Sequence, residues 1–177
     1  MLTRPGEQFH IRGLVREVGT EINAVRRELS NLESVGLLFS RKSGNRIYYT
    51  VNTHSVYYPE FLALIAKSFG LGVNIISGAK NLGDVKFAML SKAFAGKRRK
   101  SSPLDVDLFV VGKVNIDALE DMVKKEQELR GYEINYAVMG EDEFNYAKRK
   151  SDQFAIRLLL QSRIMLMGDE EEFCALS

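Results

Sequence analysis

The chain has few residues that could form a disulfide or a zinc site. Among 177 residues it has one cysteine, Cys174, and two histidines, His10 and His54. A single cysteine cannot form an internal disulfide, and three such residues cannot supply the four ligands of a structural zinc ion. Any metal ion would therefore have to be bound by carboxylates.

Long apolar runs are also missing. Met1 is followed by LTRPGEQFHIRG, which contains no run of the length that a signal peptide or a membrane span requires. We therefore expect no membrane partner and a cytoplasmic location. Hydrophobic residues make up 45% of the chain, enough for one large globular domain or two small ones.

The charge is unevenly distributed along the chain. The net charge is +2, but the residues up to Asn52 carry eight Lys and Arg against five Asp and Glu. The remainder carries seventeen basic residues against eighteen acidic ones. The positive charge is thus concentrated in the first third.

The pattern of the first third predicts a helix, a second helix and a β-hairpin. FHIRGLVREVG, residues 9–19, has apolar residues at helical spacing and ends at a glycine. Residues 20–36 begin with Thr20, the expected N-cap, and carry one apolar stripe: Ile22, Val25, Leu29 and Leu32. LLFSRKSGNRIYYTVN then predicts two strands around a Gly44-Asn45 turn.

These segments resemble the winged helix-turn-helix of prokaryotic transcriptional regulators over residues 8–52. The resemblance implies a domain at residues 1–54 that binds double-stranded DNA, with its second helix in the major groove and the hairpin as the wing. The implied contacts are Thr20, Asn23, Arg26 and Arg27 from the helix, with Arg41, Lys42, Asn45 and Arg46 from the hairpin. The hairpin cations would meet phosphates or the minor groove. The alternative is a solvated face of a protein-interaction module.

One departure from that family is visible at the start of the chain. The family has a full helix before the segment equivalent to FHIRGL, whereas only MLTRPGEQ precedes it here. Without that helix, an apolar face of the domain would be left open. We expect a partner chain or the C-terminal region to cover it, unless Met1 is not the natural start.

The rest of the chain is predicted to form a connecting helical segment, residues 55–82, and a small α/β domain, residues 83–177. The expected strands are DVKFAMLS, LDVDLFVVG and YEINYAVM. The expected helices are IDALEDMVKKEQELRG and one or two within DEFNYAKRKSDQFAIRLLLQS. The whole chain is therefore expected to be of the α+β or α/β class.

This second domain resembles the minimal nucleotidyltransferases, whose fold belongs with the polymerase-β-like transferases. The family has a Gly-Ser turn after its first strand, a further glycine, an Asp-x-Asp strand and a third acidic residue on a later strand. Here the matching positions are Ser91-Lys92, Gly96, and Asp105 with Asp107, and the third falls at Glu133 or Asn135. Two aspartates two apart on a strand share a face and could converge on Mg²⁺.

The departures from the signature favour lost transfer activity. A side chain at position 91 crowds the approach of the backbone to a triphosphate, and the lysine at position 92 replaces a small hydroxyl. Between Gly96 and Asp105 lies the basic run GKRRKSS, which could bind nucleotide phosphate, extend a DNA-binding surface or simply be solvated.

The sequence therefore predicts a homodimeric DNA-binding regulator that requires no cofactor. Its second domain would serve dimerisation, nucleotide sensing or partner binding. The alternative is an active, antitoxin-like nucleotidyltransferase that uses Mg²⁺ and a nucleoside triphosphate, with Asp105 and Asp107 as metal ligands.

Overall fold

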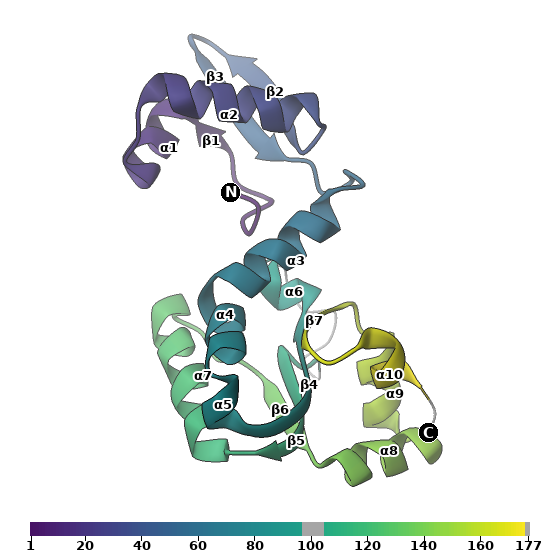
Figure 1. Ribbon diagram of the computed structural model, residues 1–177. Helices are drawn as coiled ribbons and strands as arrows, with labels where there is room; N and C mark the ends of the chain where they lie inside the picture. Colours follow the sequence, from purple (N-terminus) through teal and green to yellow (C-terminus); the bar gives the residue numbers. More distant parts are fainter. Residues whose placement is uncertain (97–104, 176–177) are drawn as a thin grey trace. The chain divides into compact units, whose positions relative to one another are not determined.

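The computed structural model describes residues 1–96 and 105–175 and combines helices with two separate sheets. The mixed α and β composition expected from the sequence is confirmed. The chain divides into two compact units, Met1–Leu62 and Ala63–Ser177. Helix α3 (Tyr58–Ser68) crosses the division between them (Figure 1).

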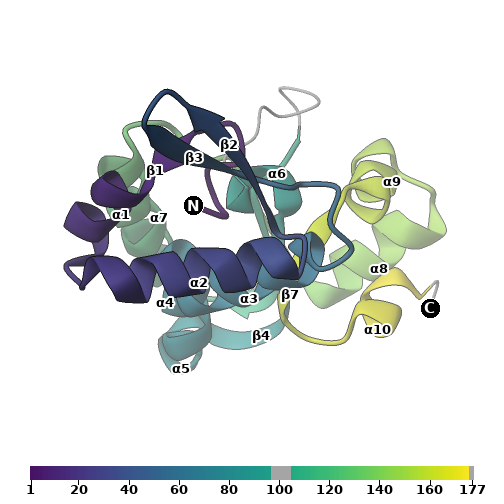
Figure 2. The same ribbon diagram turned by 90° about the horizontal axis from the view of Figure 1, so that it is seen from above.

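The first unit combines two helices with a three-stranded antiparallel sheet. Its elements are β1 (Phe9–His10), α1 (Ile11–Val18), α2 (Ile22–Ser34), β2 (Leu38–Ser43) and β3 (Arg46–Val51). The strand order is β1-β3-β2, and β2 and β3 form a hairpin that turns at Gly44, whose φ is 56°. Figure 2 shows α2 running alongside this hairpin.

The helices of the first unit are amphipathic and pack their apolar sides against the sheet. Leu14 of α1 and Val25 and Leu29 of α2 are buried, and Leu38 and Tyr49 of the sheet are buried as well. The opposite faces of both helices are exposed and polar, which is the usual pattern of a helix lying on a small core.

The structure corrects three details of the sequence prediction in this unit. The expected helix over residues 9–19 begins only at Ile11, because residues 9 and 10 pair with Tyr49 and Tyr48 as β1. Thr20 is not the N-cap of α2, since Glu21 holds that position without a side-chain cap. Ile22, expected in the buried stripe, is 36% exposed.

The segment before β1 packs on the first unit without forming a helix. The guanidinium of Arg4 lies 4.9 Å from the ring centre of Phe9 and pairs with Glu7 and Glu17. The hydroxyl of Tyr58 donates a hydrogen bond to the carbonyl of Leu2 at 3.3 Å. This short segment is thus held on the first unit through Phe9, Glu17 and Tyr58.

The second unit is a four-stranded sheet with helices on both faces. Its strands are β4 (Gly83–Ser91), β5 (Leu108–Val114), β6 (Tyr136–Met139) and β7 (Arg163–Met167). Its helices after α3 are α4 (Gly70–Ser77), α5 (Ala79–Leu82), α6 (Lys92–Ala95), α7 (Ile116–Arg130), α8 (Glu141–Arg149), α9 (Gln153–Leu160) and α10 (Glu170–Cys174). The strand order is β6-β5-β4-β7, with β5 and β6 parallel and the other pairs antiparallel.

Alternate residues of the central strands face the two helical layers. On one side a cluster of aromatic rings brings together Phe87, Phe109, Phe144 and Phe173. Figure 1 shows α8, α9 and α10 on one side of this sheet and α4, α5 and α7 on the other. Both faces are covered, which explains why the central strands are almost entirely apolar.

Two strands begin later than the sequence predicted. Strand β5 starts at Leu108, so Asp105 and Asp107 lie in the segment that leads into it and not on the strand itself. Strand β6 starts at Tyr136, so Glu133 and Asn135 also precede their strand. Asp105 therefore lies outside the strand pairing that the alternation argument assumed, whereas the backbone of Asp107 is still hydrogen-bonded to Ser91 and Asn135.

No single helix in residues 1–96 and 105–175 is long and apolar enough to cross a membrane. Helices α3 and α4, bent by 57° at the break between them, meet that length and composition only when taken together.

Candidate functional site

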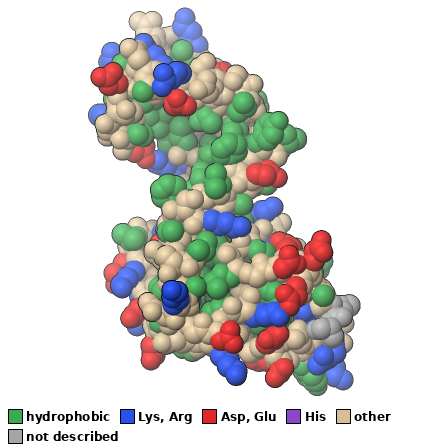
Figure 3. Space-filling view, in the orientation of Figure 1, with side chains coloured by type: hydrophobic (Ala, Val, Ile, Leu, Met, Phe, Trp, Pro, Cys, Tyr) green, Lys and Arg blue, Asp and Glu red, His purple; other side chains and the backbone are tan. Residues whose placement is uncertain are grey.

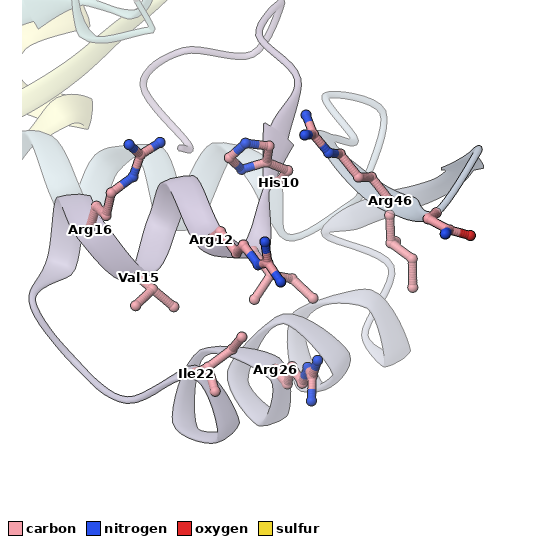
Figure 4. A pocket seen from close by; sticks show the side chains of 10 residues that line it. His10, Arg12, Val15, Arg16, Ile22, Arg26 and Arg46 are labelled. Carbon is pink, nitrogen blue, oxygen red and sulfur yellow. The ribbon is translucent and has the colours of Figure 1, made fainter.

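The first unit contains an open pocket with a volume of about 960 Å³ between its helices and the tip of the hairpin (Figure 4). Strand β1 and helix α1 contribute His10, Ile11, Arg12, Val15 and Arg16. Helix α2 contributes Ile22 and Arg26, and the hairpin contributes Asn45, Arg46 and Ile47. We call these ten residues the basic cleft.

The basic cleft has positive charge that no carboxylate of its lining balances. Four of its ten residues are arginines and none is acidic. Within the described parts of the chain, no ion pair or side-chain hydrogen bond holds the guanidinium groups of Arg12, Arg16, Arg26 and Arg46. These four groups are therefore available to bind an anion.

Two other arginines of the same unit are already paired, whereas Arg41 on β2 is exposed, lies outside the cleft lining and has no ion pair among the described residues. Arg4 forms ion pairs with Glu7 and Glu17, and Arg27 lies 3.4 Å from Glu28. The acidic side chains of α10 gather instead on the second unit, as Figure 3 shows. The basic cleft is the place in this unit where four unpaired guanidinium groups lie together.

His10 links the cleft to the start of α1. Its Nδ1 accepts a hydrogen bond from the backbone N–H of Gly13 at 2.7 Å, so the imidazole is the N-cap of the helix. Because Nδ1 is an acceptor, the neutral ring carries its proton on Nε2, which remains a donor. The ring can take this position because Gly13 has no Cβ. A Cβ there would lie only 2.8 Å from the ring atoms Cε1 and Nδ1.

Arg26 also influences the pKa of Tyr49, a buried residue of β3. Burial raises the pKa of the Tyr49 phenol above its ordinary value, and the negative charge of Glu33 raises it further. The positive charge of Arg26 lowers the pKa of Tyr49 and so opposes both effects. The cation is thus close enough to the buried phenol to act on it electrostatically.

The cleft includes some of the residues expected from the sequence and not others. Three of the expected DNA contacts line it: Arg26, Asn45 and Arg46. The other five are exposed but lie outside the lining: Thr20, Asn23, Arg27, Arg41 and Lys42. None of the eight is packed inside the unit.

The sequence analysis missed the contribution of α1. His10, Arg12 and Arg16 line the cleft, although none of the three was among the DNA contacts expected from the sequence. The available signal was the spacing of Arg12 and Arg16, four residues apart and therefore on one face of an amphipathic helix. Their proximity to the hairpin tip could not be read from spacing alone.

The second expected site lies where β4 ends and β5 and β6 begin. The N–H of Ser91 donates to the carbonyl of Asp107 at 2.9 Å, and the N–H of Asp107 donates to the carbonyl of Asn135 at 2.7 Å. The fold therefore brings together three of the positions named by the resemblance. Residues 97–104, which contain most of the basic run, lie outside the described residues.

The polar groups of this second site are engaged in holding the fold. The hydroxyl of Ser91 accepts the N–H of Phe94 at 3.0 Å and so caps α6. The Oδ2 of the buried Asp107 accepts the N–H of Asn135 at 2.9 Å. Lys92 is half-buried at the start of α6, and Gly96 is buried at its end.

The donor set does not fit a two-metal centre. Two metal ions require several carboxylates, but Asn135 has an amide side chain, which donates to the carbonyl of Asp105 at 3.5 Å. Glu133 is exposed two residues earlier. The described residues contain no group of three His, Cys, Asp or Glu side chains that could hold a metal ion. Residues 97–104 include none of these residue types in the sequence.

Comparisons of the chain with protein-family models, with curated proteins and with solved structures gave no match.

Proposed function

We propose that the protein binds double-stranded DNA through the basic cleft of its first unit and acts as a transcriptional regulator. The observation that carries the proposal is the group of four unpaired arginines, converging from α1, α2 and the hairpin on one surface without a carboxylate. Phosphates of a duplex are regularly spaced anions and are the natural complement of such a surface.

The arrangement of elements supports a winged helix-turn-helix mode of binding. Helix α2 has 13 residues and an exposed polar face, and a helix of this kind fits the major groove. Asn23, Arg26 and Arg27 on that face would contact base edges. Arg46 at the hairpin tip and Arg12 on α1 would contact phosphates on either side and set the orientation of the helix.

The chemistry of the cations suits nucleic acid. All four cations of the cleft are arginines, whose planar guanidinium groups bind phosphate oxygens in pairs. The neighbouring Asn45 and the Nε2–H of His10 add neutral donors that suit phosphate oxygens. An acidic peptide would satisfy the charge but leave the exposed face of α2 without a role.

The second unit is proposed to be a nucleotidyltransferase-like domain without transfer activity, which serves dimerisation, nucleotide sensing or partner binding. Supporting this, Ser91 and Asp107 use their side chains in backbone hydrogen bonds, and Asn135 stands where a third carboxylate would be required. A homodimer would let two clefts occupy two half-sites of an operator.

DNA binding is tested by fluorescence anisotropy with a labelled mixed-sequence duplex at 50 to 200 mM salt. We expect a plot of log affinity against log salt with a slope of about −4, since each neutralised phosphate contributes about −0.9. Arg46→Ala should make the slope shallower by about 1. The control is Lys124→Ala, at an exposed position of α7 in the second unit, which should change nothing.

Three outcomes would contradict the proposal. They are no measurable binding, a slope near zero, and equal losses for Arg46→Ala and Lys124→Ala. Displacement of the duplex by polyglutamate at equal charge would favour a protein partner instead. For the second unit, transfer of label from ATP with Mg²⁺ that disappears in Asp105→Ala would show that it is an active enzyme.

A further inference from the structure

We propose that Ile22 recognises the methyl group of thymine in the major groove. The inference rests on the proposed function, because it assigns a sequence preference to the surface that is proposed to bind DNA. It concerns the apolar part of the basic cleft, which phosphate binding alone does not use.

The basic cleft has apolar side chains exposed among its cations. Ile22 at the start of α2 is 36% exposed, and Ile47 on β3 is 42% exposed. Figure 4 shows Ile22 and Arg26 side by side on α2. The two residues are four apart in the helix, so they lie on one face, one turn from each other.

The position of Ile22 suits contact with a base better than contact with the protein core. It is the first residue of α2, whereas Val25 and Leu29 of the same helix are buried. A single exposed isoleucine is common on protein surfaces. At the N-terminal turn of a helix in the major groove, however, side chains meet base edges.

The base that offers an apolar partner there is thymine. In the major groove thymine presents a methyl group, while the other three bases present only donors and acceptors at their edges. Burying a methyl group against an aliphatic side chain removes apolar surface of both from water. Losing that contact should weaken binding about fourfold.

Ile47 provides an internal contrast on the same surface. It follows Arg46 on the hairpin, which is proposed to lie along the phosphate backbone. An isoleucine there would contact deoxyribose, which is the same in every sequence. Ile22 should therefore contribute to specificity, and Ile47 to affinity without specificity.

The experiment begins by selecting binding sites for the full chain from a random duplex pool. Each thymine of the selected site is then replaced singly by deoxyuridine, which lacks only the methyl group. We expect at least one replacement to weaken binding of the unaltered protein about fourfold. Ile22→Ala should bind the thymine and deoxyuridine duplexes with equal affinity. Ile47→Ala should bind both duplexes more weakly by the same factor and should keep the fourfold difference between them.

The outcomes separate this inference from the proposed function. Salt-dependent DNA binding with no effect of any deoxyuridine, or with the full effect retained in Ile22→Ala, overturns the thymine contact and leaves DNA binding standing. A selected site without thymine would likewise overturn the thymine contact and leave DNA binding standing. Absence of DNA binding overturns both. Circular dichroism melting of the two variants, both altered at exposed positions, checks that they fold.

Discussion

Replacing Gly13 by alanine tests the structure of the cleft at the start of α1. Alanine in place of glycine inside a helix is normally stabilising by about 1 kcal/mol. Here the new Cβ would lie 2.8 Å from Cε1 and Nδ1 of His10, so the ring would have to move and release the N–H of Gly13. Losing an N-cap costs about 1 kcal/mol, and the two effects should nearly cancel.

The cancellation becomes visible in a double-mutant cycle with His10→Ala. Without the imidazole there is no ring to displace, so Gly13→Ala should stabilise that background by about 1 kcal/mol. The coupling free energy between the two positions is therefore expected to be about 1 kcal/mol. The assay is amide hydrogen exchange of α1 in the full chain, measured for all four proteins.

Equal stabilisation by Gly13→Ala in both backgrounds would refute the reasoning. It would mean that His10 does not cap α1 and that the glycine is not required for the position of the ring. The result also bears on the cleft, because His10 lines it.

Two further predictions concern the second site and the core of the first unit. Asp107→Ala should lower the free energy of unfolding by about 1 to 3 kcal/mol, because the N–H of Asn135 loses its acceptor. Asp107→Asn keeps an oxygen at that position, so its loss of stability, measured by urea unfolding, should be smaller. Equal losses for the two variants would contradict this role of Asp107. Because the folded pKa of Tyr49 is raised, its protonated phenol stabilises the fold below the unfolded pKa of about 10, and that stability is lost as pH rises through the folded pKa. Between pH 9 and pH 11 the unaltered protein should thus lose more stability than Tyr49→Phe, whereas parallel losses would show that Tyr49 does not titrate differently on folding.

The sequence predicted the longer elements well because their patterns are local. Helix α7 and the β2-β3 hairpin lie within one or two residues of their expected positions. Strand β1 was missed because two residues are too few to show a period. The starts of β5 and β6 were placed too early because Asp105 and Glu133 follow the alternation of the strands, although the strands begin only at Leu108 and Tyr136.

The sequence by itself determined the mixed α and β class and the concentration of positive charge in the first third. Both depend on composition and on spacing between near neighbours. Only the tertiary structure decided that arginines from α1, α2 and the hairpin share one cleft, and that Asp107 is hydrogen-bonded to Asn135. These facts depend on distances between residues far apart in the chain, which are set by packing of the helices against the sheets and not by the local pattern.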